Sequence, residues 1–204
     1  MLHLIYYFCI IVNQIKNNKM LKKTSIILLA AITILFAACD KDDPIIPNEE
    51  ELITTLNYSL TPTGGGAAIV LSYKDLDGDG GDAPIITGGT LSANQTYTGA
   101  LDLLNEIESP AESITAEIEE EDEDHQFFFQ STASEVSIVY NDQDADGNPV
   151  GLSTTLTTGA ATTGSITITL RHEPSKTASG VSTGDLTNAG GETDIEVTFP
   201  IDVQ

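Results

Sequence analysis

Short stretches in which apolar and polar residues alternate run from about residue 52 to the end of the chain. Alternation of this kind puts apolar side chains on one face of an extended segment, so it predicts half-buried β-strands. The clearest case is the segment SITITL, residues 165–170. We expect strands over residues 52–60, 67–73, 98–105, 125–131, 135–141, 165–172 and 194–203, with shorter ones within 84–91 and 151–157.

One segment near the middle of the chain departs from this pattern. Ser109 and Pro110 suit the N-cap and the first position of a helix, and acidic residues follow in the first turn. Ile114 and Ile118 are four residues apart and would share one helical face. The sequence therefore predicts a single short helix over residues 110–121.

The predicted elements recur in the same order along the chain. The segment IVLSYKDLDGDGG around Tyr73 resembles VSIVYNDQDADGN around Tyr140, and residues 96–103 resemble residues 161–168. Two halves are too few for a solenoid, so the pattern predicts an antiparallel, immunoglobulin-like β-sandwich in which the helix connects two similar halves. An ordered loop or a weaker helical turn is expected over residues 175–191. A closed β-barrel is the alternative architecture.

The N-terminal region has the features of a targeting segment. Lys22 and Lys23 precede an apolar run, residues 26–38, which is shorter than a membrane span and suits a signal peptide. The run ends in LFAAC, which resembles the lipobox cut before a cysteine that carries lipid, here Cys39, and Met20 begins a complete signal peptide. The expected segments are a misassigned extension (1–19), a lipoprotein signal peptide (20–38), a lipidated acidic linker (39–51) and a single β-sandwich domain (52–204).

Lipid at Cys39 would anchor the protein to a membrane without spanning it. The next residues, DKDD, resemble the export tag of surface lipoproteins in Bacteroidota, which implies the outer membrane and its external face; a plain solvated spacer is the alternative. Cys9 and Cys39 are the only cysteines, so the domain can hold neither a disulfide nor a cysteine-bound metal.

The charge of the chain is concentrated after the cleavage point. All 31 acidic residues follow Cys39, whereas the basic residues that follow it are Lys41, Lys74, Arg171 and Lys176. A field this negative repels nucleic acid and anionic lipid, so no nucleic-acid partner is expected. The partners that this negative charge favours are cations, or a basic patch on another protein.

The repeated loop of the two halves carries the pattern D-x-D-x-D-G, in which alternate carboxylates could converge on Ca²⁺. The candidate ligands are Asp75, Asp77, Asp79 and Asp82 in the first loop and Asp142, Asp144 and Asp146 in the second, with Asn148 as a further donor there. An EF-hand is excluded because its twelfth position needs Glu, whereas Ile86 and Ser153 stand there and strands flank both loops. Asp and Gly are also common in ordinary hairpin turns, so an empty turn is the alternative.

The two histidines of the domain are the second candidate site. His125 and His172 are each expected at a strand end, beside Asp124 and Glu173. Two imidazoles with carboxylates could hold Zn²⁺ or Cu²⁺, and haem is a further option. The sequence does not show whether these histidines meet in space.

No enzyme activity is expected, because enzyme chemistry finds little support in the sequence, which lacks H-E-x-x-H and P-loop motifs. The segments YTGALDLLNE, EEEDEDHQFFF, DADGNPVG and LRHEP resemble a group of small outer-membrane lipoproteins of Bacteroidota associated with TonB-dependent receptors. That resemblance implies an accessory role in nutrient capture. We therefore expect a surface or periplasm-facing lipoprotein that binds a ligand, a metal ion or metal complex, for an outer-membrane receptor. A structural or adhesive sandwich with calcium-stabilised loops is the alternative.

Overall fold

The computed structural model describes residues 51–78 and 81–204. All of these residues belong to one compact unit, Glu50–Gln204. The predicted extension, the signal peptide and the lipidation site Cys39 lie outside the described residues, as does Asp79. Within the described part of the chain, no helix has the length and the apolar character needed to cross a membrane.

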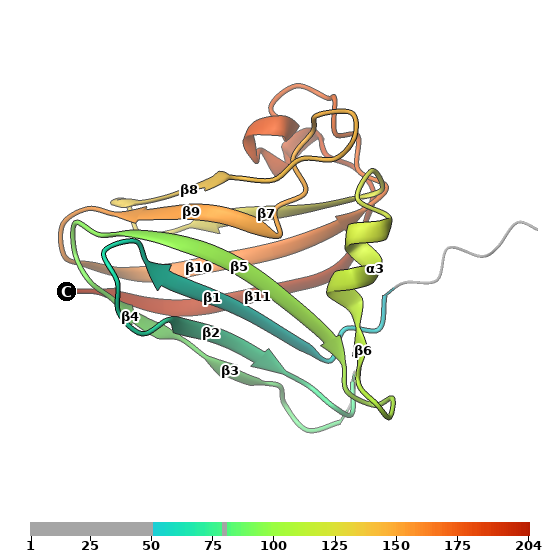
Figure 1. Cartoon of the computed structure of the whole chain (residues 1–204), viewed down its shortest axis with the longest axis horizontal. Helices are drawn as coiled ribbons and strands as arrows, with labels where there is room; N and C mark the ends of the chain where they lie inside the picture. Colours follow the sequence, from blue (N-terminus) through green and yellow to red (C-terminus); the bar gives the residue numbers. More distant parts are fainter. Residues whose placement is uncertain (1–50, 79–80) are drawn as a thin grey trace, which may run out of the picture. The chain divides into compact units, whose positions relative to one another are not determined.

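The strands form two separate sheets (Figure 1). The first has the order β3-β2-β1-β5-β9-β8, with β6 paired to β5, and the second has the order β4-β11-β10-β7. Neighbouring strands are antiparallel except β4 and β11, which are parallel. The first sheet consists of β1 (Thr55–Pro62), β2 (Ile69–Lys74), β3 (Ile85–Thr87), β5 (Thr96–Asn105), β6 (Glu112–Ser113), β8 (Val136–Tyr140) and β9 (Ser153–Thr158). The second consists of β4 (Gly89–Leu91), β7 (His125–Ser131), β10 (Thr162–His172) and β11 (Glu192–Val203).

Apolar side chains from both sheets meet in one core, which confirms the sandwich and not the closed barrel. Alternate residues of β5 and β11 are buried, as the sequence pattern predicts. Tyr58 and Leu103 of the first sheet belong to the same buried cluster as Phe127, Ile168 and Phe199 of the second. Each large side chain buried in this way contributes about 1.5–3 kcal/mol to the hydrophobic stabilisation of the fold.

The two similar halves share part of their strand pairing. In the first half β1 pairs with β5 and β2 with β3; in the second, β7 pairs with β10 and β8 with β9. The halves differ in one respect: β1 and β2 pair in one sheet, whereas β7 and β8 belong to different sheets. The chain therefore crosses from one sheet to the other between β7 and β8, and the final strand β11 pairs with β10.

The predicted helix exists but begins later than expected. Helix α3 spans Ile114–Glu120, and the Oγ of Ser113, not of Ser109, accepts the capping hydrogen bond from the N–H of Ala116. The expected start at residue 110 is wrong because residues 112–113 are extended and pair with the end of β5 as β6. Ile114 and Ile118 are buried as predicted.

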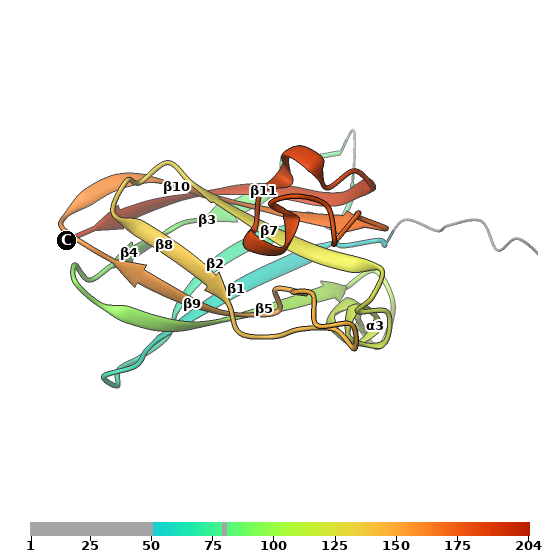
Figure 2. The ribbon, with the colours of Figure 1, turned by 90° about the horizontal axis from the view of Figure 1, so that it is seen from above.

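The segment 175–191 is an ordered loop with two 3₁₀ turns, η1 (Val181–Thr183) and η2 (Leu186–Asn188), as expected. It covers the outer face of β7, where Phe128, Val181 and Ala189 form a small buried cluster (Figure 2). Both faces of β7 are therefore covered, one by the core and the other by this loop.

Candidate metal centre

The strand register brings the two histidines together. His125 begins β7 and His172 ends β10, and the antiparallel pairing places them directly opposite each other. Their rings stack with centroids 4.5 Å apart and an interplanar angle of 24°. His125 has no exposed surface and His172 is 7% exposed. Because side chains alternate along a strand, His125 lies on the same face as Phe127, which is the core face.

A β-bulge supplies the third group of this site. Opposite Leu170 the partner in β11 is Ile195, but opposite Arg171 it is Thr193, so Asp194 is the extra residue of β11. A bulge of this kind redirects a side chain that strict alternation would place on the other face. The Asp194 Oδ2 lies 4.0 Å from the His125 Nε2, and both side chains are fully buried.

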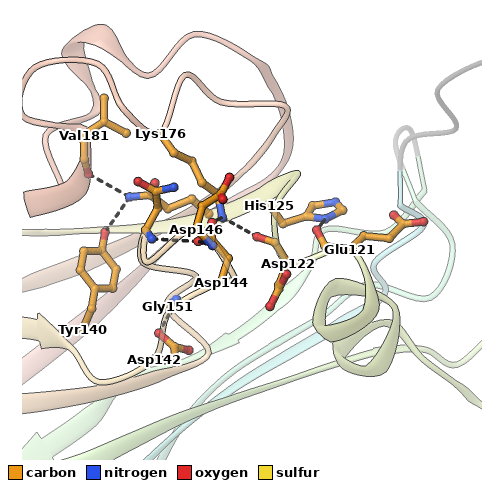
Figure 3. Close-up of polar contacts among 12 residues, drawn as sticks. Glu121, Asp122, His125, Tyr140, Asp142, Asp144, Asp146, Gly151, Lys176 and Val181 are labelled. Atoms are coloured by element: carbon orange, nitrogen blue, oxygen red, sulfur yellow. Dashed lines mark hydrogen bonds and ion pairs between the residues drawn. The ribbon is translucent and has the colours of Figure 1, made fainter.

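The turn after helix α3 fixes the orientation of the His125 ring. Its Nδ1 lies 3.1 Å from the carbonyl oxygen of Glu121, the C-cap residue directly after the helix (Figure 3). A ring that donates from Nδ1 keeps a lone pair on Nε2, the nitrogen that faces Asp194. Metal-bound histidines commonly donate their other ring N–H to a carbonyl in the same way.

Two ring nitrogens of the pair are left without a hydrogen-bond partner. They are the Nε2 of His125 and the Nδ1 of His172, and both are buried. Leaving a buried polar atom unpaired costs about 1–3 kcal/mol, so such atoms need an explanation. A cation bound by these two nitrogens and by Asp194 would supply one.

The three ligand atoms of His125, His172 and Asp194 all lie within 4.8 Å of one another. Ligands about 2.0–2.2 Å from a tetrahedral Zn²⁺ are roughly 3.3–3.6 Å apart, so the ligand atoms, such as the His125 Nε2 and Asp194 Oδ2 at 4.0 Å, would move closer together around an ion. Two imidazoles and one carboxylate suit Zn²⁺ or Cu²⁺ and leave a coordination position open. A single ion fits the stacked, buried rings better than a haem, which stays a prediction without support from this geometry.

A second group of potential ligands shares His125. Atoms of Glu51, Glu121 and His125 also lie within 4.8 Å of one another. Glu51 is half-buried and Glu121 is exposed. Neither glutamate was expected from the sequence, where both belong to acidic runs with no distinguishing pattern.

The first Asp loop has the hydrogen bonds of a turn. Asp75 Oδ1 accepts from the backbone N–H of Asp77 at 3.3 Å and of Gly78 at 2.9 Å. Asp77 Oδ2 accepts from the N–H of Asp82 at 2.8 Å. These carboxylates are engaged with the loop backbone, and calcium binding here stays a prediction because Asp79 lies outside the described residues.

Asp142 in the second loop is also bound to backbone. Its two oxygens accept from the N–H groups of Gly151 and Ser153, each at 2.8 Å. These contacts fix the start of β9 to the end of β8. Asp146 offers its own N–H to the neighbouring carboxylate of Asp144 at 3.1 Å.

The carboxylate of Asp144 forms a buried ion pair with the side chain of Lys176. The Asp144 Oδ1 also accepts a hydrogen bond from the N–H of Asn148 at 2.8 Å, and its Oδ2 accepts one from the ammonium of Lys176 at 2.8 Å (Figure 3). Lys176 also donates to the carbonyl of Asp122. The side chains of Lys176 and Asp144 are only 5% and 1% exposed. Burial alone would raise the pKa of the Asp144 carboxyl, but Lys176 and Asn148 outweigh it, so this pKa lies below its ordinary value.

Comparison with known proteins adds little to these observations. No protein-family model matches the sequence, and no curated protein matches it. Among solved structures, the chain is similar to domains 4 and 5 of the S-layer protein SbsC, with 13% identity over 72% of this chain and 75% of that chain. The TM-score of 0.22 is too low for that similarity to support an argument about function.

Proposed function

We propose that this protein is a lipid-anchored outer-membrane protein whose β-sandwich binds one Zn²⁺ or Cu²⁺ ion and serves as an accessory to an outer-membrane receptor. The observation that carries the proposal is the buried group of His125, His172 and Asp194. Two of its ring nitrogens, the Nε2 of His125 and the Nδ1 of His172, are buried without hydrogen-bond partners, and a bound cation would explain this.

The chemistry of this group selects among metal ions. Ca²⁺ and Mg²⁺ prefer six or more oxygen ligands, whereas imidazole nitrogen suits Zn²⁺ and Cu²⁺. With three protein ligands, one position stays open to water or to a ligand atom from another molecule. An open position is what a protein needs if it is to release its ion to a partner.

The overall charge supports the same function. After Cys39 the chain has 31 acidic residues and four basic ones. A strongly negative surface raises the local concentration of cations and the rate at which they arrive. The surface would thus collect cations without selectivity, and the buried histidines would select among them.

Metal titration of the full chain, freed of metal, tests the proposal. The wild type should bind one Zn²⁺ or Cu²⁺ in competition with a chelating indicator. His172→Ala and Asp194→Asn should each weaken binding by at least roughly 10–100-fold, since even outer-shell changes cost that much. Asp102→Asn removes an exposed carboxylate of β5 outside both ligand groups and serves as the matched control.

Two outcomes would overturn the proposal. One is a wild type that binds neither ion at micromolar concentration. The other is unchanged affinity in both His172→Ala and Asp194→Asn while circular dichroism shows that they are folded. Stabilisation by Ca²⁺ alone would favour the adhesive sandwich with calcium-stabilised loops instead.

The cellular part of the proposal has its own test. Cys39→Ala should release the protein from the membrane fraction, because a single cysteine is expected to carry the lipid. Persistence of this variant in the outer membrane would contradict lipid anchoring and leave the metal-binding part untouched.

A further inference from the structure

His125 belongs to two groups of potential metal ligands at once. One is the buried group with His172 and Asp194, and the other is the group with Glu51 and Glu121. In each group the ligand atoms lie within 4.8 Å of one another. The two groups are therefore adjacent, with one imidazole in common.

The two groups differ in exposure. Glu121 is exposed and Glu51 is half-buried, whereas His125 is completely buried and the side chain of Asp194 has no exposed surface. A path from solvent to the buried group that passes these glutamates therefore leads from carboxylates that solvent reaches to buried ligands, of which His172 is 7% exposed.

The ligand chemistry changes along the same path. Glutamate carboxylates are hard, charged ligands that attract a hydrated cation, while imidazole nitrogens bind Zn²⁺ and Cu²⁺ more selectively. Carboxylates that solvent still reaches keep part of their water and hold a transition-metal ion weakly. Such a pair captures an ion quickly and gives it up quickly.

We propose that Glu51 and Glu121 form an outer station where the ion first binds, and that it then moves past His125 to His172 and Asp194. This inference rests on the proposed metal-binding function. The outer station makes association of the ion fast, and the buried group makes its binding tight. Because the same route serves for departure, loss of the outer station slows both association and dissociation and leaves the equilibrium affinity nearly unchanged.

The test is the kinetics of Zn²⁺ capture by the full chain, measured by stopped flow with a fluorescent zinc indicator. The station variant carries Glu51→Gln and Glu121→Gln together. The matched control carries Glu120→Gln and Glu123→Gln, which remove two exposed acidic charges from the same region but lie outside both ligand groups. His172→Ala isolates the outer station.

The station variant should associate with Zn²⁺ about tenfold more slowly than the wild type, within the range over which local charge changes association rates. Its equilibrium affinity should change less than about threefold, and the control variant should keep at least about half of the wild-type rate. His172→Ala should retain fast, weak capture. Circular dichroism confirms that each variant is folded.

The outcomes separate this inference from the function on which it rests. A wild type that binds no Zn²⁺ refutes the proposed function itself. A wild type that binds tightly, with the station variant associating as fast as the control, refutes the outer station and leaves the buried site intact. Equal slowing in the station and control variants also refutes it, because the effect then comes from the general negative field.

Discussion

Replacing Lys176 by Met should remove the buried cation that the second Asp loop is built around. The ammonium lies 2.8 Å from Asp144 Oδ2, and the two side chains are 5% and 1% exposed. Met has a similar length, so the packing of the aliphatic part is kept and the charge is lost. Asp144 is then a buried carboxylate whose remaining donors are the N–H groups of Asp146 and Asn148.

Breaking a buried ion pair by removing one partner costs about 3–5 kcal/mol. The low end applies here, since Asp144 keeps two backbone donors. In a domain of this size a loss of about 3 kcal/mol lowers Tm by roughly 6–12 °C. Urea unfolding followed by tyrosine fluorescence and circular dichroism measures the free energy of unfolding directly.

Lys74→Met is the matched control. Lys74 also forms an ion pair, with Glu106 at 2.6 Å, but these side chains are 43% and 29% exposed. Solvent screens an exposed pair of this kind, so it contributes little to stability and this variant should unfold almost as the wild type does. The double variant Lys176→Met, Asp144→Asn should recover at least about 1 kcal/mol over Lys176→Met, because it removes the uncompensated charge.

Equal, small losses in the free energy of unfolding of Lys176→Met and Lys74→Met would refute the reasoning. So would a double variant that is no more stable than Lys176→Met. Either result would mean that Asp144 finds water or another donor when Lys176 is gone.

Three further predictions concern the rest of the domain. Burial, and after it the neighbouring acidic groups, raise the pKa of Glu117 from 4.5 to about 7, so its contribution to stability is complete below about pH 4.5 and decreases as the pH rises through 7. Glu117→Gln should therefore flatten the dependence of Tm on pH in this window, and an unchanged profile would contradict the assignment. Thr154→Val leaves the buried hydroxyl of Tyr58 without its 2.7 Å partner, which should cost about 1–3 kcal/mol in urea unfolding; a loss below about 0.5 kcal/mol would show that the hydroxyl finds another partner. Any increase of Tm on adding Ca²⁺ should vanish in Asp75→Asn, because Lys176 already supplies a cation to Asp144 in the second loop; loss of the response only in Asp142→Asn would reverse that order.

The strands could be predicted from the sequence because alternation reports directly which side chains face the core. Residues 125–131 were predicted as a strand and form β7 with the same bounds. The helix start could not be predicted in the same way. Ser109 and Ser113 are both suitable caps, and only the pairing of residues 112–113 with β5 decides between them.

The sequence predicts both histidines as candidate ligands, but it does not predict that they meet in space. Their meeting depends on the register between β7 and β10, which are far apart along the chain. The carboxylates expected beside them were those adjacent in sequence, Asp124 and Glu173. The carboxylate in the buried group is that of Asp194, which a bulge turns toward the rings, and no residue pattern signals that bulge.

The Asp loops show most clearly what a sequence motif alone does not predict. Both loops carry the D-x-D-x-D-G pattern, and the structure shows backbone N–H groups donating to four of the described carboxylates, those of Asp75, Asp77, Asp142 and Asp144. The cation beside Asp144 comes from Lys176, which lies 32 residues away in the loop between β10 and β11. Such long-range neutralisation of a loop carboxylate depends on the tertiary fold.

The most direct test of the central claim is anomalous X-ray scattering at the zinc edge from crystals of the metal-free protein soaked in Zn²⁺. The account predicts one strong peak at about 2.0–2.2 Å from nitrogen atoms of His125 and His172 and an oxygen of Asp194. A peak confined to the Asp loops, or the absence of a peak near His125, His172 and Asp194, would contradict it.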